Sequence, residues 1–225
     1  MAARYAVGVD VGGTKIYAGV IELESGKVVG SQRKRTHPER GLDFFVKRLT
    51  DVITSALDAA DLPKGAAPLG IGVGIAGQVD RESGVLLTGP NLGQGLDNLP
   101  IRDLLQKQFK LPVYLGNDVE VATYGEHHYG AGRDCDDFVC IFVGTGIGAG
   151  ISSLATFYNP DRIILGGGLI DATTLLFDRT ALRTHESTLP AATRALAVHR
   201  AQLGDDSGII GAAWMAEAQQ VNALT

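Results

Sequence analysis

The chain has 225 residues, which suits one large domain or two small lobes with a substantial hydrophobic core. Its net charge of −5 argues against a nucleic-acid-binding surface, and its two cysteines are too few for a disulfide framework or a four-ligand zinc site. No apolar run approaches the roughly 20 residues that span a bilayer, and Met1 to Arg4 leave no room for a signal peptide before the first strand, so we expect a cytoplasmic protein without a membrane partner.

The first informative stretch is Asp10 to Lys15. A strand predicted at Tyr5–Val9 runs through Asp10 into Gly12-Gly13-Thr14-Lys15, and a second strand follows at Ile16–Ile21. The glycines let the chain reverse and bring N–H groups close to a bound anion. Thr14 and Lys15 offer a hydroxyl and a cation to phosphate oxygens, and Asp10 is placed to hold a divalent metal or its water. A plain β-hairpin with a Gly-Gly turn explains the same letters.

The remaining elements follow in chain order. Further strands are predicted at 28–36, 69–75, 112–115, 138–143, 147–151 and 161–165. Helices are predicted at 41–60, 100–109, 118–129, near 152–158, near 170–182 and at 208–219. The stretch Gly72 to Gly77 matches G-x-G-x-x-G, but a turn-like sequence follows it where a dinucleotide site needs a helix. That motif therefore does not indicate a dinucleotide cofactor.

Two later strands also end in glycines. The predicted strand at 138–143 runs into Gly144-Thr145-Gly146, and the strand at 161–165 runs into Gly166-Gly167-Gly168 before a helix. Three strand-to-glycine turns, two of them with threonine, favour a phosphate-binding cradle over three unrelated hairpins.

These pieces resemble the ROK family (repressors, open reading frames and kinases) of the actin, hexokinase and Hsp70 superfamily. The resemblance runs along nearly the whole chain, in the family's order, through further matching stretches at 74–80, 89–92, 116–119 and 203–213. It implies an α/β fold of two RNase H-like (actin-like ATPase) lobes with a cleft between them. The first lobe would comprise 1–115, joined by a C-terminal helix at 207–225, and the second 116–206, shortened at 151/152.

The resemblance also implies a kinase that uses ATP and Mg²⁺ to phosphorylate a hexose, in the manner of glucokinase. ATP phosphates would be held by two motifs, and the adenosine bordered by a third; the implied residues are Asp10, Gly12, Gly13, Thr14, Lys15, Gly144, Thr145, Gly146, Gly166, Gly167 and Gly168. Asp10 would be the carboxylate on the Mg²⁺ side. Lys15 reaches phosphate in this reading, or lies exposed at the hairpin.

The sugar side of the resemblance rests on three residues. Asn91 and Asn117 match residues that hydrogen-bond sugar hydroxyls, and Asp118 matches the catalytic base that takes the hydroxyl proton. Each has a structural alternative: Asn91 follows a proline and forms turns readily, whereas Asp118 begins a predicted helix and would cap it.

One family segment is absent from the sequence. Relatives carry a long insert after the strand like Ile147–Ile151, with a Glu-x-Gly-His motif, a cysteine-rich zinc site and a glutamate, but in this chain Ile151 passes directly into Ser152. No zinc site is expected, and neither His127 nor His128 is interpreted as a zinc ligand. We expect nucleotide binding to persist and hexose turnover to be weak or absent, because several sugar hydrogen bonds would be lost.

Two alternatives to a hexose kinase stay open at this point. One is a sugar or nucleotide sensor without catalysis, and the other is a ROK transcriptional regulator that lacks its DNA-binding domain, for which there is no space ahead of Asp10. The sequence does not choose the sugar, does not choose between ATP and polyphosphate as donor, and leaves open a homodimer and the origin of the shortened middle.

Overall fold

The computed structural model describes residues 3–142, 158, 160–187 and 196–224. The chain divides into two compact units, one formed by Met1–Gly125 together with Ser207–Thr225 and the other by Glu126–Asp206. The division falls between Gly125 and Glu126, inside the helix Asp118–Tyr129, whereas the boundary predicted from the sequence lies before Gly116. The first unit therefore takes residues from both halves of the chain.

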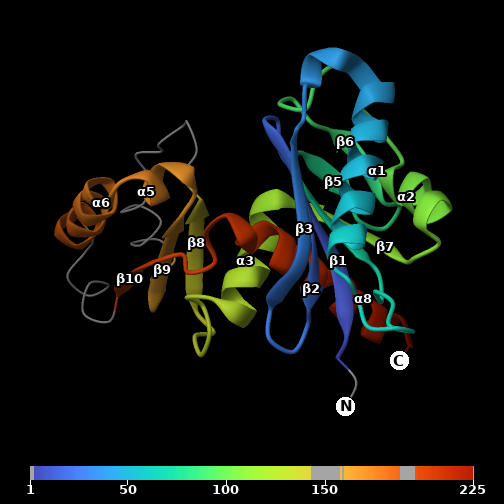
Figure 1. The fold of residues 1–225 in the computed structure, drawn as a ribbon. Helices are drawn as coiled ribbons and strands as arrows, with labels where there is room; N and C mark the ends of the chain where they lie inside the picture. Colours follow the sequence, from blue (N-terminus) through green and yellow to red (C-terminus); the bar gives the residue numbers. More distant parts are fainter. Residues whose placement is uncertain (1–2, 143–157, 159, 188–195, 225) are drawn as a thin grey trace. The chain divides into compact units, whose positions relative to one another are not determined.

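A five-stranded mixed sheet forms the centre of the first unit, in the order β3-β2-β1-β4-β7 (Figure 1). Its strands are β1 (Tyr5–Val11), β2 (Lys15–Glu22), β3 (Lys27–Arg35), β4 (Ile71–Ile75) and β7 (Val113–Asn117). The pairs β1–β2 and β2–β3 are antiparallel, while β4 is parallel to both β1 and β7. The strands predicted for this part of the chain are confirmed within a few residues.

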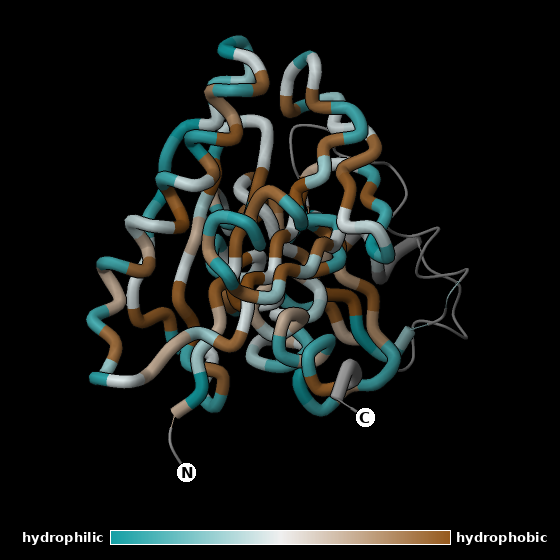
Figure 2. Tube along the Cα trace, turned by 90° about the vertical axis from the view of Figure 1, so that its right-hand side faces the viewer, coloured by the Kyte–Doolittle hydropathy of each residue, from teal (hydrophilic) through white to brown (hydrophobic). Residues whose placement is uncertain are grey.

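One face of this sheet carries the main hydrophobic core. Alternate residues of β1 point to it, including Val7, Val9 and Val11, and none of these side chains is exposed to solvent. The helices α1 (Gly41–Ala59) and α2 (Ile101–Phe109) contribute to this core, α1 through Phe45 and its neighbours one turn apart. Figure 2 shows hydrophobic residues, in brown, and hydrophilic residues, in teal, alternating along many segments of the trace.

The opposite face of the sheet is lined by glycines, and the C-terminal helix α8 (Ser207–Leu224) lies directly on it. A Cβ atom at Gly8 would overlap the backbone carbonyl of Ile209, and one at Gly72 would overlap the carbonyl of Ala212. The helix backbone therefore approaches the strands more closely than any side chain would allow.

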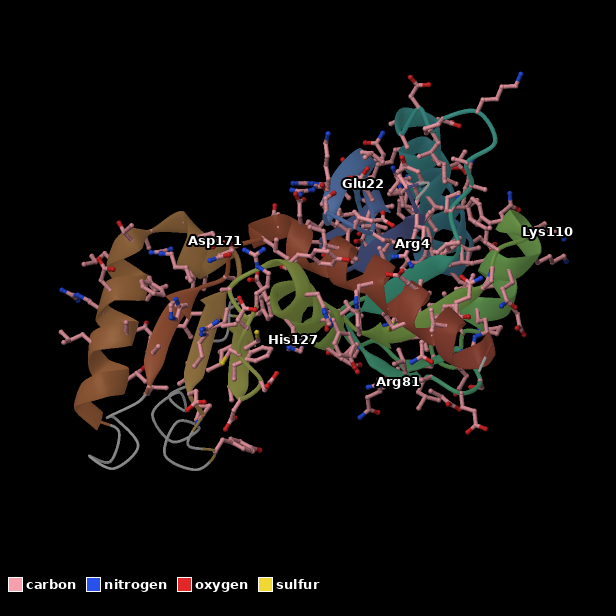
Figure 3. The ribbon with its side chains drawn as sticks, turned by 90° about the horizontal axis from the view of Figure 1, so that it is seen from below. Arg4, Glu22, Arg81, Lys110, His127 and Asp171 are labelled. Atoms are coloured by element: carbon pink, nitrogen blue, oxygen red, sulfur yellow. The ribbon has the colours of Figure 1, made fainter. Side chains whose placement is uncertain are left out.

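Glycines also let α8 pack against α3 (Asp118–Tyr129). A Cβ atom at Gly211 would overlap the carbonyl oxygen of Val121, and Gly125 lies against the Ser207 carbonyl in the same way. At its other end, α8 is joined to the start of the chain, because its Glu217 forms an ion pair with Arg4, which is labelled in Figure 3. Arg4 also pairs with Glu24 at 2.9 Å.

The segment after Gly77 forms a hairpin. Strands β5 (Gln78–Asp80) and β6 (Val85–Thr88) pair in antiparallel fashion directly behind the G-x-G-x-x-G letters. The prediction that this motif does not open a helix is confirmed.

The second unit contains a three-stranded parallel sheet in the order β10-β9-β8. Its elements are β8 (Phe138–Phe142), β9 (Arg162–Gly166), β10 (Ala197–Arg200), α5 (Gly168–Ala172) and α6 (Thr174–Ser187). The single helix predicted near 170–182 is wrong: Thr173 adopts an extended conformation and separates two helices. The strand β10 was not predicted, and the elements predicted at 147–151 and near 152–158 lie outside the described residues apart from position 158.

A buried carboxylate organises the second unit. Glu126 has no exposed surface, and its two oxygens accept hydrogen bonds from the backbone N–H groups of Ala131 at 2.8 Å, Gln202 at 3.0 Å and Leu203 at 2.9 Å. Charge-assisted bonds of this kind offset the cost of burying the carboxylate. Glu126 thereby joins the end of α3 to the segment that follows β10.

No helix within the described part of the chain is both long and apolar enough to cross a lipid bilayer.

The close contact between α8 and the glycines of the sheet leads to a prediction about stability. We expect Gly72→Ala to lower the free energy of unfolding of the first unit by about 2 to 3 kcal/mol, because the new methyl group meets backbone atoms that cannot move independently. Urea unfolding followed by the fluorescence of Trp214, the single tryptophan of the sequence, measures this. Gly12→Ala is the control, since its nearest new contact would be an ordinary 3.5 Å. Equal stability of the two variants would contradict the close packing.

Candidate functional site

The predicted catalytic base, Asp118, and the predicted Mg²⁺-side carboxylate, Asp10, lie at one edge of the first unit's sheet. Asp10 of β1 pairs with Gly74 of β4, which in turn pairs with Gly116 of β7, so that these three residues lie side by side. Asn117 and Asp118 follow Gly116 at once. Because adjacent strands are about 4.8 Å apart, the backbones at Asp10 and Gly116 are separated by two strand spacings, or about 10 Å. The fold brings Asp10 and Asp118 to the same end of the parallel strands.

The turn between β1 and β2 is a tight hairpin. The Gly12 N–H donates to the Lys15 carbonyl at 2.9 Å, while Gly12, Gly13 and Lys15 are partly buried and Thr14 is exposed. The hairpin alternative thus describes the backbone correctly. Its small residues and exposed hydroxyl are compatible with phosphate binding, which stays a prediction for this turn.

A residue that the sequence analysis missed holds this turn in place. Thr36 is fully buried, its hydroxyl donates to the Gly12 carbonyl at 2.6 Å, and its N–H donates to the Thr14 carbonyl at 3.0 Å. Both ends of the turn are therefore tied to the residue after β3. The sequence held no signal for this role, because the bond joins residues 24 positions apart.

The predicted phosphate turn adjoins the predicted sugar residue Asn91. A Cβ atom at Gly13 would overlap the backbone oxygen of Asn91 and lie 3.1 Å from its Cβ. Asn91 itself is exposed and lines a pocket of about 500 Å³. The other residues of that pocket are Pro38, Glu39, Gly41, Pro90, Gly93 and Gln94.

Asp10 lies beside the first turn of α8. A Cβ atom at Gly208 would be 3.1 Å from the Asp10 carboxyl carbon, and Asp10 is partly buried. No cluster of three or more histidine, cysteine or acidic residues suited to a metal occurs among the described residues. A single carboxylate still fits Mg²⁺, which is commonly held by one or two carboxylates together with substrate phosphates.

The helix α3 is capped by Asn117. Its Oδ1 accepts a hydrogen bond from the Val119 N–H at 3.0 Å, and its Nδ2 donates to the Gly77 carbonyl at 3.2 Å. The structural alternative proposed for Asp118, that of helix cap, is therefore wrong. Asn117 keeps one N–H and one lone pair beyond these two bonds, since a side-chain amide has two donors and two acceptor sites.

Asp118 occupies the first helical position of α3 and is partly buried. Its carboxylate makes no hydrogen bond or ion pair with the residues that the structure describes. The position is compatible with the predicted role as a base.

The remaining predicted nucleotide residues belong to the second unit. Gly166 ends β9 and packs tightly, because a Cβ atom there would lie 2.8 Å from Ala201. Gly167 precedes α5 with a φ of 97°, a conformation that favours glycine, whereas Gly168 has open space around its Cα. Gly144, Thr145 and Gly146 lie outside the described residues.

The two histidines at the end of α3 pack against aromatic neighbours. The ring of His127 lies 4.7 Å from that of His128 and 5.2 Å from that of Phe138. Burial lowers the pKa of His128, and the adjacent His127 lowers it further. The uncharged form of His128 is therefore favoured.

The model of the ROK family matches residues 6–153 and 151–219 of the chain. The chain belongs to the ROK family. The two matched segments meet at residues 151–153, where the sequence analysis finds the family's insert absent.

Curated relatives include both enzymes and repressors. The chain is 34% identical over 145 residues to a glucokinase of Thermotoga maritima, covering 64% of this chain and 43% of the relative. It is 33% identical over 147 residues to a glucokinase of Streptomyces coelicolor, with coverages of 64% and 42%. A xylose repressor of Caldicellulosiruptor bescii is 32% identical over 146 residues, with coverages of 64% and 35%. The chain thus matches less than half the length of these relatives.

Solved structures of the family share the fold. A ROK glucokinase of Streptomyces griseus, in complex with glucose and AMPPNP, superposes with a TM-score of 0.82 at 22% identity, covering 95% of this chain and 99% of the other. A ROK hexokinase of Thermus thermophilus gives 0.74 at 22% identity, with coverages of 97% and 99%. The predicted mixed α/β fold is confirmed, since it is the fold of these ROK glucokinase and hexokinase structures.

The role of Thr36 can be tested by removing its hydroxyl. We expect Thr36→Val to cost about 1 to 3 kcal/mol of unfolding free energy, because the Gly12 carbonyl loses its partner. Amide exchange at Gly12 should become faster in this variant. Thr36→Ser keeps the hydroxyl and should leave the exchange near the wild-type rate. Unchanged exchange in Thr36→Val would mean that the bond does not hold the turn.

The division of labour between Asn117 and Asp118 gives a second test. Asn117→Ala should cost about 1 to 2 kcal/mol, since it removes the cap of α3, whereas Asn117→Asp keeps an acceptor for the Val119 N–H and should cost less. Asp118→Ala should change stability by less than about 0.5 kcal/mol. Urea unfolding monitored through Trp214 compares the three. A loss in Asp118→Ala equal to that in Asn117→Ala would contradict the assignment of the cap.

Proposed function

We propose that this chain is a sugar kinase of the glucokinase type, which transfers the γ-phosphoryl group of ATP to a hexose hydroxyl. One observation carries the proposal: Asp10, the Gly12–Lys15 turn and Asp118 lie at the same end of the parallel strands β1, β4 and β7. Sequence similarity to glucokinases over 64% of the chain supports it.

Each group has a role in this reaction. The N–H groups and the Thr14 hydroxyl of the turn hold phosphate oxygens, and Lys15 adds a positive charge. Asp10 would hold Mg²⁺ or its water, and the metal would neutralise negative charge on the phosphates. Asp118 accepts the proton of the sugar hydroxyl as its oxygen bonds to the γ-phosphorus, and ADP leaves with the electron pair of the broken P–O bond.

Sugar contacts come from Asn91 and Asn117 in this proposal. Asn91 lines a pocket beside the phosphate turn, as expected for a residue that positions a hydroxyl next to the γ-phosphate. Asn117 already makes two structural bonds, so it offers a sugar hydroxyl only its remaining donor and acceptor.

The nucleotide side extends to the second unit. Gly144, Thr145 and Gly146 bind phosphate in the proposal, and the Gly166–Gly168 triplet borders the adenosine. The left-handed conformation of Gly167 supports a backbone that approaches a ligand closely. The proposed lobes are 1–115 with 207–225, and 116–206, and the protein is proposed to be cytoplasmic. ATP is the proposed donor, and polyphosphate stays an alternative.

We expect the chain as written to bind nucleotide and to turn over hexoses weakly. The direct passage from Ile151 to Ser152 and the junction of the two family matches at 151–153 support this reading. The absent insert would complete the sugar contacts. Each hydrogen bond that is lost removes about 1 kcal/mol of binding free energy, which weakens sugar affinity roughly fivefold.

A second candidate function is sugar or nucleotide sensing without catalysis. The 32% identity to a xylose repressor over 64% of the chain favours it, because the same stretch of sequence is then part of a regulator and not of a kinase. The two candidates differ in whether nucleotide is consumed when a sugar is bound.

Release of ADP with glucose, mannose and N-acetylmannosamine tests both candidates. We expect slow turnover that Asp118→Asn reduces at least 100-fold through loss of the base, with nucleotide affinity by calorimetry unchanged. Asp103→Asn, on the exposed first turn of α2, removes the same charge and should match the wild type.

Other results would redirect the assignment. Fast turnover of any of the three sugars would contradict the weakened enzyme, and wild-type rates in Asp118→Asn would contradict the base. Nucleotide binding without any ADP release would favour the sensor.

A further inference from the structure

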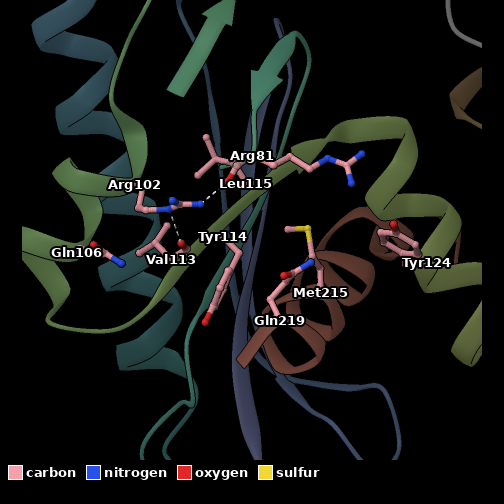
Figure 4. A pocket seen from close by; sticks show the side chains of 9 residues that line it. All are labelled: Arg81, Arg102, Gln106, Val113, Tyr114, Leu115, Tyr124, Met215 and Gln219. Atoms are coloured by element: carbon pink, nitrogen blue, oxygen red, sulfur yellow. Dashed lines mark hydrogen bonds between the residues drawn. The ribbon is translucent and has the colours of Figure 1, made fainter. Parts of the chain in front are cut away.

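A second pocket of the first unit lies along β7, apart from the residues assigned to the kinase reaction. It has a volume of about 280 Å³ and is formed by five parts of the unit: α2, β7, α3, α8 and the turn between β5 and β6 (Figure 4). The lining residues are Arg81, Arg102, Gln106, Val113, Tyr114, Leu115, Tyr124, Met215 and Gln219.

The backbone of β7 contributes donors to this pocket. Pro112 directs its carbonyl to the Ile71 N–H of β4, whereas Val113 directs its carbonyl the other way, to Nε of Arg102 at 3.1 Å. Because backbone groups alternate between the two edges of a strand, the N–H groups of Val113 and Leu115 also face away from β4. No further strand pairs with β7 on that side among the described strands.

The charge of the lining is positive. Of the nine lining residues, two are arginines and none is acidic. Arg102 uses three of its five donors on the carbonyls of Val113, Glu82 and Arg81, which fixes the guanidinium in place and leaves two donors. A guanidinium held in this way pays little conformational entropy when it binds an anion.

One carboxylate, that of Glu120, interacts with two of the lining residues through Oε1, while its Oε2 is buried and has no hydrogen-bond partner among the described residues. Glu120 forms an ion pair with Arg81 at 2.5 Å and accepts a hydrogen bond from the Tyr124 hydroxyl at 2.9 Å. Burial raises the pKa of Tyr124, and the bond to Glu120 raises it further, so the phenol stays a neutral donor to that carboxylate. The donors left for an anion are therefore the two spare N–H groups of Arg102 and the amides of Gln106 and Gln219.

The rest of the wall suits a flat apolar body. Tyr114, Tyr124 and Met215 place two aromatic rings and a thioether around the pocket (Figure 4). Such groups favour aromatic ligands through ring and sulfur contacts. A cavity of about 280 Å³ accommodates a single ring with one polar substituent.

We propose that this pocket binds a small aromatic carboxylate, with the carboxylate among the donors of Arg102, Gln106 and the β7 edge and the ring against Tyr114 and Met215. This binding is additional to the kinase reaction and does not depend on it, since none of the nine lining residues is assigned to sugar, nucleotide or Mg²⁺.

Fluorescence of Trp214 provides the measurement. The indole lies 5.2 Å from the ring of Tyr124, which lines the pocket, and it is the single tryptophan of the sequence. Titration of the full chain with benzoate should change the emission saturably, while the uncharged isostere benzamide should bind at least tenfold more weakly. No saturable change with benzoate, or equal binding of the two compounds, would overturn the proposal.

Two charge variants with a matched control locate the binding. Gln106→Glu and Gln219→Glu each place a carboxylate on the wall and should weaken benzoate at least tenfold through repulsion. Gln108→Glu adds the same charge on an exposed position of α2 that does not line the pocket, and it should bind within twofold of the wild type. Wild-type affinity in both wall variants, or an equal loss in Gln108→Glu, would show that benzoate binds elsewhere.

Discussion

The close seat of α8 on a glycine-lined face is the constraint on which the first unit depends. Gly8 and Gly72 present bare backbone to the helix, and Gly211 presents bare backbone to α3. Contact of this kind places many atoms within van der Waals range without a layer of side chains between them. The sheet therefore has a conventional aliphatic core on one face and a backbone-to-backbone interface on the other, and the second cannot form without residues from the far end of the chain.

The same face supports the candidate site. Asp10, Gly74 and Gly116 occupy equivalent positions on neighbouring strands, and two of the three are glycines. A Cβ atom at Gly74 would collide with Val121 of α3, so its absence lets that helix approach the strands and sets the position from which Asp118 projects. Helix packing and the proposed chemistry thus depend on the same row of residues, and Asp10 of this row lies beside the first turn of α8.

The sequence predicted what local pattern determines. The helix at Asp118–Tyr129 and the strand β1 follow from local hydrophobic pattern and turn chemistry, and the sequence predicts both. Thr36 and Glu126 act through bonds to backbone groups that are distant in the sequence, as Asn117 does in its bond to Gly77, and no sequence spacing predicts these bonds. The break at Thr173 and the short strand β10 carry too few residues for a pattern. The roles of the glycine turns in ligand binding rest on resemblance and chemistry, because backbone geometry alone is shared with ordinary hairpins.

The nested arrangement of the chain has a consequence for its biosynthesis. Residues 126–206 emerge from the ribosome before α8 does, so the second unit has its whole sequence available while the first still lacks its last helix. During that interval the glycine-lined face of the first unit's sheet lacks the helix that covers it in the folded chain. Because translation adds roughly 5 to 20 residues per second, the 81 residues of the interposed unit delay the closing contact by several seconds.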